Sequence, residues 1–109
     1  MISWDRVADL RSEVGEDDFS EVVEVFLEEV DETVARLKRL PDMAQLEDDM
    51  HFLKGSALNL GFKAMTAVCE DGERAAAGGR PDLVDLRKLV EVYEASRVEF
   101  LKHRDTAHS

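Results

Sequence analysis

Apolar residues recur at helical spacing in every long segment of this chain, and no segment alternates convincingly as a β-strand. This periodicity predicts an all-α fold. Five helices are expected, at about residues 3–14, 18–40, 42–60, 63–77 and 82–102. Helix-ending residues mark the breaks: Gly15, Pro41, Gly61 and the Gly-Gly-Arg-Pro turn at 78–81. Short connections favour an antiparallel up-down four-helix bundle, with the additional short N-terminal helix laid across one end.

The length of the chain suits a single domain. Residues 1–109 are expected to form one unit with a core at about 3–102 and a polar, fraying tail at 103–109. No apolar run reaches the length of a membrane span, and no signal-peptide pattern opens the chain, so a cytoplasmic protein is expected. A bundle that closes its own core is expected to be monomeric.

The charge balance bears on the classes of partner. The formal net charge is −11, which repels phosphate backbones and anionic lipid surfaces, so neither nucleic acid nor a membrane is an expected partner. Charged residues make up 36% of the chain, and with regularly spaced apolar residues this favours amphipathic helices over disorder.

Cys69 is the only cysteine, so an intramolecular disulfide is impossible. Its apolar neighbours at helical spacing predict that it packs as a small hydrophobic residue. The acidic residues Glu70 and Asp71 would raise the pKa of its thiol, so a reactive cysteine is not expected.

One histidine on the helix expected at 42–60 lies outside the apolar stripe of that helix. The stripe consists of Leu46, Met50, Leu53, Ala57 and Leu60. These residues fall within about 40° of one direction when each residue turns the helix by about 100°. His51 lies about 140° from that centre and is therefore expected to face solvent, with Lys54 beside it one turn further on.

Gly55 is unusual in the interior of a helix, where glycine costs about 1 kcal/mol relative to alanine. Its position at i+4 from His51 leaves room for something bulky to approach the ring. A neutral imidazole, with an unperturbed pKa of about 6.5, is a good nucleophile near neutral pH. Lys54 can offset the charge of an incoming phosphoryl group. The pattern indicates a phosphoryl acceptor site, although an ordinary surface histidine with Gly55 permitting tight helix packing fits the residues equally well.

The segment 51–61 resembles a known family motif. Residues 51–56, His-Phe-Leu-Lys-Gly-Ser, followed by Leu-Gly at 60–61, are similar to the pattern His-x-x-Lys-Gly-Ser…Leu-Gly of histidine phosphotransfer (HPt) domains. In outline the resemblance covers about residues 3–102. It implies a helical bundle that relays a phosphoryl group between receiver-domain aspartates through Nε2 of phosphorylated His51. It also implies that Lys54 assists with the phosphoryl charge, that Gly55 gives the partner clearance, and that Ser56 is the small polar residue typical of that position.

The resemblance also implies partners: receiver domains of response regulators and a hybrid or conventional histidine kinase. Phe52 and Leu58 both lie off the apolar stripe and are the expected docking residues, unless Phe52 packs beneath the first helix. No cofactor or metal is expected in this chain; Mg²⁺ is expected in the receiver. Because the sequence has no nucleotide-binding glycine loop, we expect a phosphocarrier without ATP-dependent kinase activity.

Several positions depart from the family pattern. Met50 stands where relatives often have alanine, Phe62 where a small residue is common, and Gly72 where leucine is usual. Glu73 lies near a position from which some relatives direct a polar side chain toward the histidine. A carboxylate there is expected to repel a phosphoryl group, so no role is assigned to Glu73.

The sequence leaves three alternative functions open. An HPt-fold interaction module could bind a receiver or kinase without carrying phosphate, although the combination of His51, Lys54 and Gly55 argues against it. A metal-binding bundle needs paired Glu-x-x-His motifs, and this chain offers a single Asp48-x-x-His51. A hydrolase would need a Ser–His–acid or Cys–His arrangement, and no such spacing stands out.

Overall fold

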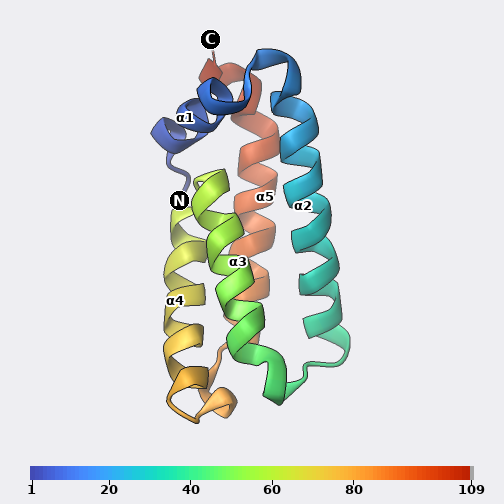
Figure 1. Ribbon diagram of the computed structural model, residues 1–109, viewed down its shortest axis with the longest axis vertical. Coiled ribbons are helices and arrows are strands. Elements are labelled where there is room, and N and C mark those ends of the chain that lie inside the picture. The colour runs from blue at the N-terminus through green and yellow to red at the C-terminus, as the bar shows by residue number, and fades with distance from the viewer. Residues whose placement is uncertain (109) are drawn as a thin grey trace.

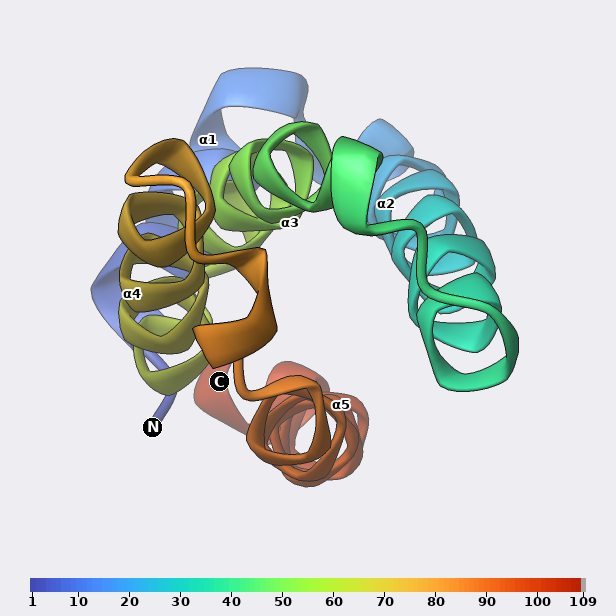
Figure 2. The same ribbon diagram turned by 90° about the horizontal axis from the view of Figure 1, so that it is seen from below.

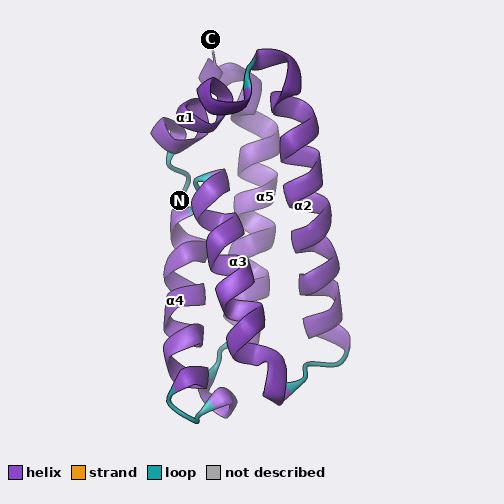
Figure 3. Cartoon of the chain, in the orientation of Figure 1, coloured by secondary structure: helices purple, strands orange, loops and turns teal. Residues whose placement is uncertain are grey.

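The computed structural model describes the backbone of residues 1–108 and the side chains of residues 1–103. The elements in chain order are α1 (Trp4–Val14), α2 (Glu16–Arg39), the 3₁₀ turn η1 (Met43–Gln45), α3 (Leu46–Leu60), α4 (Lys63–Ala77), the 3₁₀ turn η2 (Pro81–Leu83) and α5 (Leu86–His108). Figure 3 shows helices joined by short loops, with no strand in the described part of the chain. The prediction of an all-helical fold with five α-helices is confirmed.

The four longer helices run lengthwise and α1 crosses one end of them (Figure 1). The chain descends in α2 and α4 and ascends in α3 and α5 in that view. Seen from below, α3 lies between α2 and α4, and α5 closes the opposite side (Figure 2). Among the described residues, no helix combines the length and apolarity needed to cross a lipid bilayer.

Local caps explain where the first helices begin and end. The Ser3 side chain accepts a hydrogen bond from the Arg6 backbone N–H at 3.3 Å and starts α1. Gly61 ends α3 with φ of 77°, a left-handed conformation that glycine adopts without steric cost. The sequence predicted both signals. The third helix begins later than predicted, because Asp42 accepts from the Ala44 N–H at 2.9 Å and caps η1 before α3 starts.

The start of α5 differs from the prediction. The sequence placed it near Asp82, but the chain from Pro81 makes the turn η2 and α5 begins only at Leu86. The Asp85 carboxylate accepts a hydrogen bond from the Lys88 backbone N–H at 3.0 Å, as an N-terminal capping residue does. The cap therefore lies after the turn, rather than before it.

The end of α5 also differs. The helix continues to His108, beyond the predicted end near Lys102, so the stretch expected to fray is helical as far as the structure describes it. No glycine or proline occurs between Lys102 and His108 to stop the helix. The last residue of the predicted tail, Ser109, lies outside the described residues.

The core is built from the apolar faces of all five helices. The predicted stripe on α3 is fully buried, each member being at most 1% exposed: Leu46, Met50, Leu53, Ala57 and Leu60. Phe62, which replaces a small residue of the family pattern, is a core aromatic whose ring centroid lies 5.5 Å from that of Phe100. Cys69 is also buried, as predicted, and burial raises the pKa of its thiol to about 12.

The N-terminal residues strap the junction of α3 and α4. Ser3 N donates to Gly61 O at 2.6 Å, and Lys63 N donates to Met1 O at 2.9 Å. A Cβ at Gly61 would lie 2.6 Å from the Ser3 carbonyl oxygen, so the strap requires glycine there. These contacts hold the start of α1 against the end of α3 and the start of α4.

Candidate functional site

His51 lies on the outward face of α3, as its angle on the helix predicted. Its side chain is 71% exposed, and its Nδ1 lies 2.8 Å from Oε2 of Glu73 on the adjacent helix α4. The imidazole is therefore open to solvent and yet fixed in orientation by a side chain from a second helix.

Glu73 links His51 to Lys54. Its second carboxylate oxygen, Oε1, accepts a hydrogen bond from Nζ of Lys54 at 2.5 Å. The hydrogen bond from Lys54, and after it the one from His51, lower the pKa of Glu73 below its usual value. Glu73 is therefore an anion at neutral pH, with one of its oxygens paired with a cation.

The ionised Glu73 determines which nitrogen of His51 is free. A carboxylate can only accept hydrogen bonds, so the hydrogen of the neutral ring must be on Nδ1, which donates it to Glu73. The lone pair of the neutral imidazole is then on Nε2. The arrangement presents an exposed nucleophilic nitrogen with its tautomer already selected.

Glu73 has a structural role that the sequence did not predict. Repulsion of a phosphoryl group was expected, but the carboxylate contacts Nδ1 rather than Nε2, and Lys54 offsets its charge. A signal for this contact was present in the sequence. His51 precedes Gly61 by ten residues and Glu73 follows it by twelve, and residues nearly equidistant from the turn of a helical hairpin come side by side.

Gly55 faces open space. A Cβ built at this position would have no atom within 4 Å, apart from the backbone of its own helix. The glycine therefore does not serve close packing of another helix in this chain, which was the alternative interpretation of the sequence. It leaves the backbone bare one turn beyond His51.

The remaining residues of the motif divide between the surface and the interior. Phe52 is 38% exposed and Leu58 is 52% exposed, so Phe52 is not buried beneath α1 and both stay available for contact. Ser56 is 4% exposed and lies in the interior, so it does not face an incoming partner. Its small size suits that buried place.

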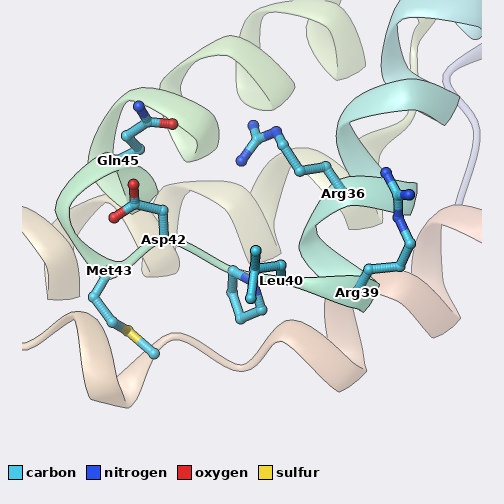
Figure 4. Close-up of a pocket in the computed structure, with 7 residues that line it drawn as sticks. Arg36, Arg39, Leu40, Asp42, Met43 and Gln45 are labelled. Carbon is cyan, nitrogen blue, oxygen red and sulfur yellow. The ribbon is translucent and has the colours of Figure 1, made fainter.

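A hollow lies on the surface away from His51. It measures about 680 Å³ and lies at the connection between α2 and α3 (Figure 4). Arg36 and Arg39 line it from α2, but Nη2 of Arg36 is engaged by Asp49 at 2.6 Å. His51 does not line this hollow, so it is not an extension of the exposed imidazole.

The metal-bundle alternative finds no ligand set in the described residues. Within them, no three histidine, cysteine, aspartate or glutamate side chains gather closely enough to hold a metal ion. Asp48, at i−3 from His51, therefore lacks the further ligands that a bundle metal site requires.

Comparison with known protein families identifies the family of this chain. A family model described as Hpt domain matches residues 21–99, which include the whole of α3 and α4 and parts of α2 and α5. Curated proteins and solved structures give no match.

Proposed function

This chain belongs to the Hpt domain family, and from that premise we propose that it relays a phosphoryl group between receiver-domain aspartates through Nε2 of His51. Hpt domains are phosphocarrier modules rather than kinases, and they interact with receiver domains and kinases of two-component systems. In the proposed form the chain acts as a monomeric cytoplasmic domain, and α2–α5 form the antiparallel four-helix bundle that holds His51.

One observation carries the proposal: the exposed His51 ring donates from Nδ1 to an ionised Glu73. A surface histidine without a role has no need of a fixed tautomer. Here the hydrogen bond leaves Nε2 unprotonated in the neutral ring of a side chain that is 71% exposed. Such orientation of the nucleophile is a main contribution that a protein can make to phosphoryl transfer, which depends mostly on positioning and charge.

The chemical step moves one phosphoryl group. The Nε2 lone pair attacks the phosphorus of a receiver aspartyl phosphate; a P–N bond forms as the P–O bond breaks, and its electron pair leaves with the aspartate carboxylate. The ring keeps its hydrogen on Nδ1 and gains positive charge, which Glu73 balances across the hydrogen bond. Transfer to a second receiver reverses these events.

Lys54 and Gly55 support this step in different ways. Lys54 pairs with Glu73 in the resting chain, so it holds the carboxylate in place and limits its repulsion of the incoming phosphoryl group. Gly55 leaves the approach to the ring clear. We propose that this chain binds no cofactor of its own and that the receiver supplies its acidic pocket and Mg²⁺.

The test is transfer from a ³²P-phosphorylated receiver that labels the wild-type chain. His51→Gln should abolish labelling, whereas His103→Gln, which removes an exposed histidine on α5, should leave it intact. Circular dichroism checks that both variants are folded. Label that persists in His51→Gln would overturn the assignment. A wild-type chain that binds receivers and accepts no phosphate from any of them would instead identify a non-transferring interaction module.

A further inference from the structure

A basic hollow lies on the same side of α3 as His51. It measures about 350 Å³ and opens where α1 and α4 begin and α3 ends, with Arg6, Leu58 and Lys63 in its lining. Leu58 follows His51 by seven residues, which places it about 20° away around the helix and about 10 Å further along it. The exposed Leu58 side chain therefore connects the His51 surface with the hollow.

Lys63 gives this hollow a positive charge that no described side chain pairs with. Its side chain is exposed, and it has no ion-pair partner among the described residues. The chain has a net charge of −11, so a cation without an ion-pair partner beside this hollow is a local exception to the prevailing negative charge. It favours a partner that brings a negative charge to this point.

The start of α4 differs from the starts of α1, α2 and α3, although α5 also has no acidic residue in its first turn. Those three helices each carry acidic residues in their first turn, which compensate the helix dipole. α4 has no acidic residue in its first turn and no side-chain cap, and its first residue is Lys63. The helix dipole disfavours a lysine there, so helix stability does not explain its presence, and the positive end of α4 adds to the charge of the lysine.

Arg6 contributes a second cation, held in place against α3. Its Nη1 donates to Glu13 at 2.9 Å and its Nη2 donates to Oδ1 of Asn59 at 3.0 Å. The Asn59 amide in turn donates to the carbonyl oxygen of Gly55 at 3.1 Å. This chain of hydrogen bonds fixes the guanidinium at the rim of the hollow, although Glu13 offsets part of its charge.

We infer that this hollow is the specificity-determining part of the receiver-docking surface, and that it selects receivers presenting an apolar side chain next to a carboxylate. The inference rests on the proposed phosphorelay function. A standard protein interface covers about 800 Å² on each partner, equivalent to a disc with a radius of about 16 Å. A receiver centred on His51 therefore covers Leu58, and its edge reaches the hollow that Leu58 lines. The apolar part fits beside Leu58 and the carboxylate pairs with Lys63.

The experiment compares Lys63→Glu with Lys88→Glu, which makes the same charge change at an exposed position on α5, at the opposite end of the bundle. Transfer from a phosphorylated receiver that labels the wild-type chain is measured as KM and kcat. Lys63→Glu should raise KM about tenfold with little change in kcat, because a charge at the edge of an interface acts mainly on encounter. Lys88→Glu should change neither KM nor kcat. A higher salt concentration should reduce the difference in KM between the two variants.

Direct phosphorylation of His51 by phosphoramidate, which needs no docked protein, separates the two hypotheses. Lys63→Glu should be labelled by phosphoramidate at the wild-type rate, which also shows that its site is intact. If both lysine variants transfer with wild-type KM, the docking inference is wrong, whereas the proposed phosphorelay function is unaffected. If no receiver labels the wild-type chain although phosphoramidate does, the relay function itself fails, and the inference with it.

Discussion

Gly55 on α3 and Gly72 on α4 are both glycines inside long helices, yet their surroundings are opposite. A Cβ at Gly72 would lie 2.9 Å from the sulfur of Met50 and 3.3 Å from a methyl carbon of Val84, whereas a Cβ at Gly55 would meet nothing within 4 Å. Gly72 allows α4 to pack closely against α3. Gly55 has no such packing role among the described residues, which supports the proposed clearance for a partner.

The same contrast extends to the two sides of α3. The side that faces Gly72 carries the fully buried Met50 and the rest of the core stripe. The other side carries the exposed His51, with Glu73 reaching across from α4. The two sides therefore make different demands: substitutions on the buried side should act on stability, and those on the open side should act on transfer.

The largest expected effect is that of Gly55→Leu on phosphoryl transfer. A leucine side chain one turn from His51 should keep a receiver from close approach, and a misplacement of about 1 Å can cost about a hundredfold in rate. The free energy of unfolding should not fall, because the added Cβ meets no atom within 4 Å and leucine favours helix. Quenched time courses measure the rate of phosphoryl transfer, and urea denaturation measures the free energy of unfolding. Wild-type transfer in Gly55→Leu would mean that the clearance serves no partner.

Gly72→Ala should show the reverse pattern. The added methyl group presses on Met50, which is fully buried and has little room to move. Overpacking costs about 1–3 kcal/mol, and alanine in place of glycine returns about 1 kcal/mol of helix propensity, so the free energy of unfolding should fall by up to about 2 kcal/mol. Urea denaturation measures this, with Glu70→Gln on the exposed face of α4 as the control. An unchanged midpoint would show that Met50 repacks at no cost.

The smallest expected effect is that of Glu73→Gln. Glutamine keeps an acceptor for Nδ1 of His51 but loses the charge, so transfer should slow by about tenfold, as expected when a charge-assisted hydrogen bond is weakened. Because the pKa of Glu73 is lowered, the stability that its ionised form contributes is complete above the usual carboxyl range and is lost as pH falls through its folded pKa. Nitrogen NMR of the His51 ring should show hydrogen on Nδ1 in the wild-type chain and a mixture of tautomers in the variant. Equal tautomer populations and equal rates would remove Glu73 from the mechanism.

Features that depend on local sequence were predicted well. The outward direction of His51 follows from its angle to the stripe on its own helix. The start of α1 follows from Ser3, and the end of α3 follows from Gly61. Such features need only the geometry of one helix and its caps. The start of α5 was missed because Asp85, rather than Asp82, caps the helix, and both aspartates are reasonable caps when the sequence is considered alone.

Features that depend on how helices face each other were predicted less well. The contact of Glu73 with His51 needs the phase of α4 relative to α3; the similar spacing of the two residues from Gly61 pointed to it, but the pattern of neither helix alone did. For Gly55 the sequence left two interpretations open, clearance beside His51 and close packing of another helix, and only the placement of the neighbouring helices decides between them.

The burial of Cys69 has a practical consequence for spectroscopy. With its pKa raised to about 12, the thiol is protonated at neutral pH and enclosed by the core, so maleimide and methanethiosulfonate reagents should leave it unmodified in the folded chain. A reporter cysteine can then be placed at an exposed position such as Asp48 without removing the native one. Distances from that reporter to a labelled receiver would follow docking in an otherwise unaltered molecule.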